Sequence, residues 1–272
     1  MLPPTFEFPN GKRKALTFSY DDGQVFDRKL VEIFNKYGMK ATFHLNSGTL
    51  SVDRGFEAFV TKDEVAELYK GHEVAVHGVQ HKSLTGLSKH QMILELEDDR
   101  KALEALSGTM VQGRSYAFGS YNGDVIEVAK SLGIKYSRTV NSTNGFFPPA
   151  DFMAWNPTCH HDGDLDGLAE RFLNMPSWEE LPVLYVWGHS YEFGRKDDYS
   201  VIERFVEKLA GKDDTWYATN IEICEYIEAT RKQEFSADGL TMKNPTAVTV
   251  YVSTKDGLIE VKPGECKYLG ER

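Results

Sequence analysis

Two short motifs in the chain combine residue types that can bind a divalent cation. The first is the pair Asp21 and Asp22, whose carboxylates repel each other unless a positive group lies beside them. The second is His77 and His81, two imidazoles four positions apart. Taken alone, the aspartates would be a surface turn and the histidines ordinary core or surface residues. Together, two histidines and one aspartate leave an open coordination position for water, as catalytic zinc-type sites do.

Two further motifs carry histidine. His189 follows the apolar run 183–188, and an imidazole can act as acid or base near neutral pH. Residues 188–192 (GHSYE) nearly match the nucleophile elbow of serine hydrolases, but the last position is not glycine, so a serine hydrolase is a weak alternative. Residues 159–162 (CHHD) offer a second metal cluster. Because these four lie too close in sequence to converge on one ion, a structural or substrate-lining role is preferred.

The elements that must position these residues alternate between β-rich runs and amphipathic helical stretches. We expect strands at 15–20, 40–45, 73–77, 116–118, 134–138, 183–188 and 215–218, and helices at 26–37, 61–69, 88–106, 122–132, 165–173, 199–209 and 221–231. This repetition predicts an α/β fold with parallel strands and favours a barrel over an open sheet. Catalytic residues of a barrel lie where strands end, which is where both aspartates and His77 fall.

The last part of the chain has a different pattern. Strands are expected at 247–252 and 258–261, joined by the turn 255–257 (KDG), and 263–264 (PG) form another turn. The sequence therefore predicts a main domain over residues 1–235 and a short C-terminal β extension over 236–272, packed on the barrel because it is too small to be stable alone.

Composition excludes several classes of function. The 272 residues include 41 acidic and 31 basic ones, a net charge of −10, which disfavours binding to nucleic acid or to an anionic membrane. No apolar run approaches the ~20 residues of a membrane helix. The three cysteines suggest neither a disulfide framework nor a zinc knuckle. With no leader segment visible, we expect a cytoplasmic protein, or a secreted one if the sequence is truncated, and a homo-oligomer is an open alternative.

The motifs resemble those of one family. Residues 19–23 (SYDDG) and 71–81 (GHEVAVHGVQH) resemble the first two motifs of the NodB-like polysaccharide deacetylases, carbohydrate esterase family 4. Residues 40–44 (KATFH) and 216–226 (WYATNIEICEY) resemble the second strand and the closing strand and helix of that family. The resemblance covers residues 12–232 and implies a distorted (β/α) barrel that removes acetyl groups from sugars with the help of a metal.

The resemblance also implies residue roles. Asp21 would be the general base, and Asp22, His77 and His81 would bind the metal. His189, in a last motif that reads WGH where the family has L-x-H, would protonate the leaving group. The cofactor would be one divalent ion, with Zn²⁺ as first choice; Co²⁺, Ni²⁺, Mn²⁺ and Fe²⁺ suit the same ligands.

The third motif departs from the family pattern. It reads YAFG over residues 116–119, with alanine where proline is usual. Arg114 lies one place earlier than the arginine that orients the base in the family. It is still the first candidate for that role, and Arg138 is the second. Phe118 would supply a backbone N–H to the oxyanion. Tyr116, Phe118 and Trp187 are expected to line the substrate site.

The fourth family motif, D-x-x-D-W, is not found in place. Trp155 is the candidate for the aromatic wall that this motif would supply, and Asp151 is a guess for the carboxylate that pairs with His189.

Three functions follow. The first is a metal-dependent hydrolase that deacetylates N-acetylated sugars or polysaccharide. The alternatives are an amidohydrolase that cleaves a small ring amide, ureide or formamide, and an inactive carbohydrate-binding protein.

Overall fold

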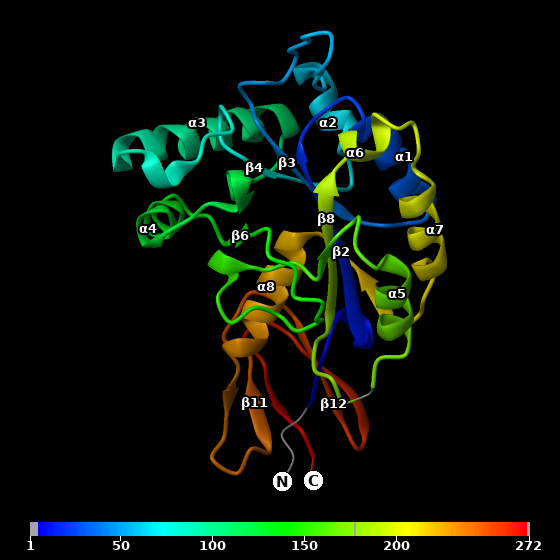
Figure 1. Cartoon of the computed structure of the whole chain (residues 1–272). Coiled ribbons are helices and arrows are strands. Elements are labelled where there is room, and N and C mark those ends of the chain that lie inside the picture. The colour runs from blue at the N-terminus through cyan, green and yellow to red at the C-terminus, as the bar shows by residue number, and fades with distance from the viewer. Residues whose placement is uncertain (1–4, 177, 271–272) are drawn as a thin grey trace.

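The computed structural model describes residues 5–176 and 178–270, and its centre is a parallel β-sheet (Figure 1). The strands run in the order β6-β5-β4-β3-β2-β8-β7, and β9 also pairs with β2. Their bounds are β2 Lys14–Asp22, β3 Ala41–Leu45, β4 Glu73–Val76, β5 Gly113–Ser115, β6 Tyr136–Arg138, β7 Cys159–His160, β8 Val183–His189 and β9 Thr215–Tyr217. The sheet is curled, and helices pack around its outer side. The predicted distorted (β/α) barrel is therefore confirmed.

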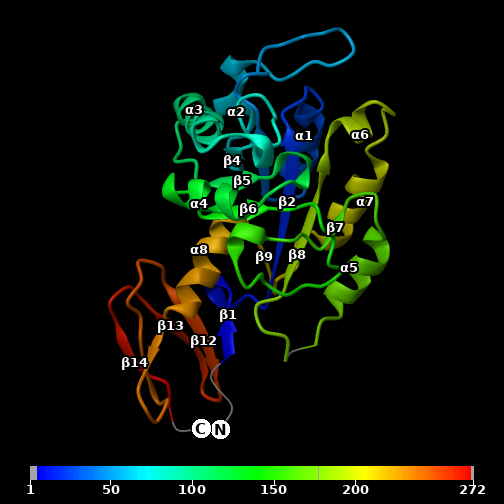
Figure 2. The ribbon, with the colours of Figure 1, turned by 60° about the vertical axis from the view of Figure 1, so that its left-hand side comes forward.

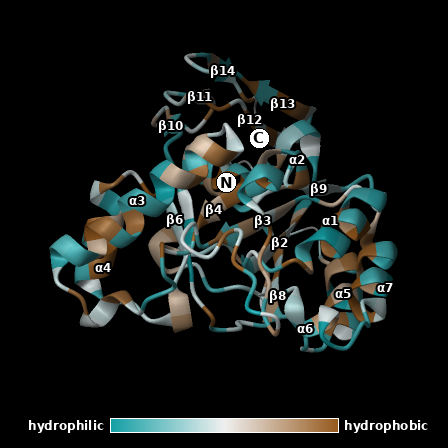
Figure 3. Ribbon diagram, turned by 90° about the horizontal axis from the view of Figure 1, so that it is seen from above, coloured by the Kyte–Doolittle hydropathy of each residue, from teal (hydrophilic) through white to brown (hydrophobic). Residues whose placement is uncertain are grey.

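Helices flank the sheet on its outer side. They are α1 Asp27–Lys36, α2 Val65–Leu68, α3 Lys89–Ser107, α4 Gly123–Ser131, α5 Leu165–Leu173, α6 Tyr191–Gly194, α7 Ser200–Leu209 and α8 Asn220–Arg231. Seen from above, α3 and α4 lie on one side and α5 and α7 on the other, with the central strands between them (Figure 3). No helix in residues 5–176 or 178–270 is both long and apolar enough to cross a membrane.

The central strand β2 is buried along nearly its whole length, as expected of a parallel strand covered on both faces. Its Phe18 packs against Phe34 of α1, with ring centroids 4.7 Å apart. Helix ends follow local signals: Ser88 and Gln91 form a capping box at the start of α3, and Gly108 ends that helix with φ +70°. These local rules explain why most elements lie where the sequence predicts them.

The strand predicted at 116–118 is wrong. The chain instead forms β5 over Gly113–Ser115 and then a 3₁₀ turn over Ala117–Gly119. Phe118 adopts φ +58°, a left-handed conformation that a strand does not allow. The shift of three residues decides which side chains of this segment face the site.

Two small antiparallel sheets lie below the barrel (Figure 2). One joins β1 Thr5–Glu7 to the predicted hairpin of β12 Val250–Thr254 and β13 Gly257–Val261, and the other joins β10 Glu234–Phe235, β11 Thr241–Lys243 and β14 Cys266–Tyr268. Tyr226 of α8 links them to the barrel, because its hydroxyl donates to the carbonyl of Glu7 and accepts from the N–H of Tyr251 at 3.1 Å. The domain boundary after residue 235 stays a prediction, and the pairing of β1 with β12 crosses it.

Candidate active site

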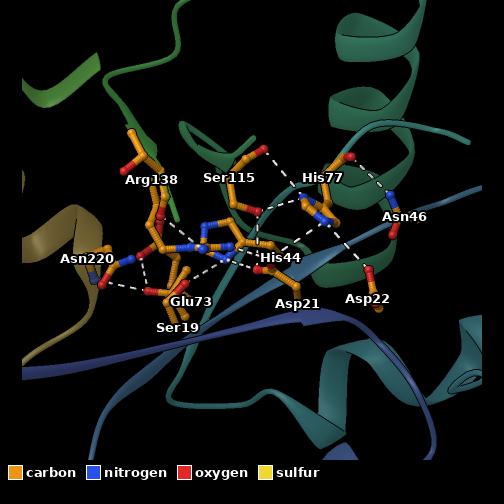
Figure 4. Close-up of polar contacts among 12 residues, drawn as sticks. Ser19, Asp21, Asp22, His44, Asn46, Glu73, His77, Ser115, Arg138 and Asn220 are labelled. Carbon is orange, nitrogen blue, oxygen red and sulfur yellow. Dashed lines mark hydrogen bonds and ion pairs between the residues drawn. The ribbon is translucent and has the colours of Figure 1, made fainter. Parts of the chain in front are cut away.

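Asp21 lies at the carboxyl end of β2, in register with His44 on β3 and His189 on β8. Residues in register on parallel strands face the same side of the sheet, so Asp21 is surrounded by polar side chains from several strands (Figure 4). It pairs with Arg138 and accepts a hydrogen bond from Ser115 Oγ at 3.2 Å. Burial acts to raise the pKa of Asp21, but Arg138, His77 and His44 together hold it well below its usual range. The carboxylate is therefore ionised and held in one place.

Arg138, and not Arg114, contacts Asp21, which corrects the first of the two sequence candidates. Ser115 and Arg138 are paired in register on β5 and β6, so both side chains face Asp21. Arg114 precedes Ser115 by one residue and points to the opposite face of the sheet, because side chains alternate along a strand. There its guanidinium lies 4.6 Å from the ring centroid of Tyr116.

Asp22, His77 and His81 come together beside Asp21. Asp22 Oδ1 lies 3.5 Å from His77 Nε2 and 3.6 Å from His81 Nε2. Asp22 and His81 have φ +81° and +52°, which is unfavourable for residues with a Cβ. The positive φ of Asp22 ends the strand alternation that would send its side chain away from Asp21. Strain of this kind persists where the surrounding structure enforces it, and it clusters at functional sites.

These three residues fit a divalent ion. Ser115 Oγ donates to Asp21, so it accepts from His77 Nδ1, 2.6 Å away, and leaves the lone pair of Nε2 facing Asp22. Burial lowers the pKa of His77 well below its usual value, which keeps the ring neutral, as a metal ligand must be. Burial and the charge of Asp21 raise the pKa of Asp22. A cation beside Asp22 would lower the pKa of its carboxyl group and so offset the effects of burial and of Asp21.

The loop that carries His77 is held by two residues that the sequence did not single out. Asp99 of α3 accepts hydrogen bonds from the backbone N–H groups of His77 at 3.1 Å and Gly78 at 2.9 Å. Asn46 Nδ2 donates to the carbonyls of the same two residues, at 3.0 and 2.7 Å. Neither residue lies in a motif with metal-ligand spacing. Only the close approach of α3 and β3 to this loop identifies them.

Glu192, and not Asp151, is the carboxylate beside His189. Glu192 Oε1 lies 3.5 Å from His189 Nδ1, three residues along the chain. Burial acts to lower the pKa of His189, but Glu192, Asp21 and Asp22 raise it above its usual value. Asp151 instead caps a short 3₁₀ turn, where its side chain accepts a hydrogen bond from the N–H of Met153 at 2.9 Å. Its ion-pair partner is Lys130, not His189. The i, i+3 spacing was the available signal for Glu192.

The four aromatic candidates divide between core and surface. Trp155 is 2% exposed and packs among Tyr136, Phe152 and Tyr185 in the core, so the predicted aromatic wall is wrong. Tyr116 is 1% exposed and donates its hydroxyl to the carbonyl of Met153, which removes it from the substrate surface as well. Both side chains contact residues distant in the chain, Tyr185 for Trp155 and Met153 for Tyr116, which local patterning does not reveal.

Phe118 and Trp187 do lie at the site. Phe118 is 71% exposed, and its ring centroid lies 4.5 Å from that of His81. Trp187 is nearly buried and lies under the guanidinium of Arg138, 4.2 Å from its ring centroid. Of these four aromatic side chains, Phe118 is therefore the exposed one that a ligand bound beside Asp22, His77 and His81 could contact.

Residues 9–137 match the family model for polysaccharide deacetylases. The match includes Asp21, both histidines of the triad and Ser115. This segment, just under half of the chain, is therefore similar to the polysaccharide deacetylases. The resemblance stated from the motifs is therefore confirmed, and Arg138 and His189 of the site lie beyond the matched segment.

Curated and solved proteins resemble this chain in sequence or in fold. YxkH of Bacillus subtilis, which is assigned to the polysaccharide deacetylases, is 25% identical over 128 residues, or 46% of this chain, and the chain spans only 44% of the length of YxkH. A Mycobacterium smegmatis protein assigned to the same group has a TM-score of 0.62 at 17% identity, covering 85% of this chain and 95% of its own. The Xyl-CE4 domain of a multidomain xylanase from the hindgut metagenome of Trinervitermes trinervoides has a TM-score of 0.55 at 16% identity, covering 80% and 92%.

Proposed function

We propose that this protein is a metal-dependent hydrolase that removes acetyl groups from N-acetylated sugars or a polysaccharide built from them. The observation that carries the proposal is the arrangement at the carboxyl end of β2. There an ionised, buried Asp21 lies beside the Asp22, His77 and His81 triad and in register with His189. A base, a set of metal ligands and an acid are the parts that amide hydrolysis needs.

The residues of the chain have separable roles in this proposal. When bound, the divalent ion supplies an acidified water and an electrophile for the acyl oxygen. Asp21 accepts the proton of that water, and Arg138 and Ser115 hold the carboxylate in the orientation to do so. The low pKa of Asp21 keeps it ionised but makes it a weak base, so the water it deprotonates must already be acidic.

His189 acts on the other bond of the reaction. Its raised pKa favours the imidazolium form, which can protonate the amine of the sugar as the C–N bond breaks. Glu192 at 3.5 Å stabilises that form. Without a proton the amine is too basic to leave. Phe118, exposed beside His81, offers one apolar face to a sugar ring.

The test is acetate release from a panel of N-acetylglucosamine oligomers, with the metal content of the same sample measured. We expect activity to be lost after chelation and restored by Zn²⁺ or Co²⁺, and to be lost in Asp22→Ala and His81→Ala. His90→Ala, which changes an exposed histidine of α3, is the matched control. Full activity in the presence of EDTA would overturn the proposal.

A second candidate is an amidohydrolase that acts on a small ring amide or ureide. The observation that favours it is the burial of Tyr116 and Trp155, which leaves less aromatic surface for a sugar chain than the motifs predict. Cyclic ureides therefore belong in the same substrate panel. Their hydrolysis, without acetate release from the sugar oligomers, would select this candidate.

A further inference from the structure

A second group of metal-binding side chains lies next to His189. Glu192 Oε2 is 3.1 Å from His160 Nε2 and 2.8 Å from His161 Nε2. One ligand atom from each of the three residues can lie within 4.8 Å of the other two, as in the triad of Asp22. The three residues come from the end of β7, the turn after it and α6, and they line a cavity of about 340 Å³. The proposed reaction uses neither of these two histidines.

The outer nitrogens of both rings are already partnered. His160 Nδ1 lies 2.5 Å from Asp162 Oδ1, and His161 Nδ1 lies 3.3 Å from the hydroxyl of Tyr20. A carboxylate only accepts hydrogen bonds, so Nδ1 of His160 donates to Asp162, and Nε2 is the atom at which a cation between the ring and Glu192 would take the place of a proton. A carboxylate that holds the outer nitrogen of a histidine in this way is the usual second shell of a metal ligand.

The group is held rigidly before any ion binds. His161 is 4% exposed, and its ring lies 4.1 Å from the ring centroid of Phe193 and stacks on Tyr20. Gly188 of β8 makes room for it, since a Cβ at that position would lie 2.1 Å from His161 Nδ1. Glu192 follows β8 directly on α6, so its carboxylate is placed by the same strand that carries His189.

We propose that His160, His161 and Glu192 form a second site for a divalent cation of the Zn²⁺, Co²⁺ or Ni²⁺ class. Two imidazoles and one carboxylate suit these borderline ions better than Mg²⁺ or Ca²⁺. A bound ion would replace the direct contacts of Glu192 Oε2 with the two Nε2 atoms. Because Glu192 uses Oε2 for the ion, Oε1 remains beside His189. The second ion thereby fixes the carboxylate that contacts the proposed general acid.

The test counts bound metal on the full chain. The protein is dialysed against Co²⁺, the metal is measured by elemental analysis and the d–d absorption of the ion is recorded. We expect about two equivalents in the wild type and about one in His160→Asn. We expect about one in His81→Ala as well, with the spectrum of the other site. His90→Asn, an exposed histidine of α3, keeps two.

Glu192→Gln provides a second variant if His160→Asn does not fold, with circular dichroism melting as the check. We expect at least a tenfold weaker affinity for the second equivalent. One equivalent in the wild type, with unchanged content and spectrum in His160→Asn, would overturn the second site. Unchanged affinity in Glu192→Gln would do the same. One equivalent that His160→Asn removes and His81→Ala keeps would instead support the second site and contradict the metal of the proposed reaction.

Discussion

Replacing Arg138 by methionine isolates the ion pair that orients the proposed base. Both partners are buried, with side-chain exposures of 0% for Arg138 and 4% for Asp21. Breaking a buried pair by removing one partner costs about 3–5 kcal/mol, because the other charge stays buried without compensation. Loss of the contact with Trp187 adds about 0.5–2 kcal/mol. We therefore expect Arg138→Met to lower the free energy of unfolding at pH 7 by at least about 3 kcal/mol.

The same change predicts a shift in the pH profile. In the wild type the pKa of Asp21 is depressed, so the stability it contributes is present above its unfolded pKa and is lost as pH falls through the folded pKa. Without Arg138 the raising effect of burial is less opposed, and Asp21 becomes protonated at higher pH. We expect the acid limb of kcat/KM for acetate release to move to higher pH, and Arg138→Lys to restore it in part.

Arg114→Met is the matched control for both measurements. Arg114 is nearly as deeply buried as Arg138, on the strand next to it, but it stacks on the ring of Tyr116, and the carboxylate whose charge acts on it is Asp99, not Asp21. Burial lowers the pKa of Arg114 to about 10. Its replacement leaves the ion pair of Asp21 with Arg138 intact, so we expect a smaller loss of stability than in Arg138→Met and an unchanged acid limb. An acid limb that moves in Arg114→Met and stays in Arg138→Met would refute the assignment of Arg138 to the base.

Three further changes test the surroundings of the site. Asp99→Asn weakens the hold on the His77 loop, and we expect metal affinity to fall by about 10–100-fold, measured by competition with a chelating dye. Glu192→Gln removes a group that raises the pKa of His189, so the alkaline limb of kcat/KM moves to lower pH; an unmoved limb contradicts the pairing. Tyr226→Phe deletes the hydroxyl between α8, β1 and β12, and urea unfolding should show a loss of about 1–3 kcal/mol.

Sequence reasoning succeeded where the signal is local. The alternating elements and the hairpin between β12 and β13 depend on residues a few positions apart, and the structure has them. The spacing of His77 and His81 suggested a metal site, the family resemblance added Asp22, and the structure brings all three together. Their catalytic roles stay predictions until the variants are measured.

Long-range features were decided by the tertiary structure alone. Which arginine reaches Asp21 depends on the register of β5 against β6, where Ser115 pairs with Arg138. Arg114 and Ser115 lay outside the strand predicted at 116–118, so the sequence assigned them no face. The burial of Trp155 depends on elements that come from far along the chain. The pairing of β1 with β12 joins segments nearly the whole chain apart.

The sequence by itself predicted the class of fold, the family resemblance and three residues that could hold a divalent ion, because the alternation of strands and helices and the spacing of His77 and His81 are local properties. Only the tertiary structure decided which charged groups contact Asp21 and His189. Arg138 and Glu192 were chosen over Arg114 and Asp151 by strand register and by the turn after β8. A one-residue change in a strand exchanges its two faces, so no local pattern selects Arg138 over Arg114, whereas Glu192 had a local signal in its i, i+3 spacing from His189.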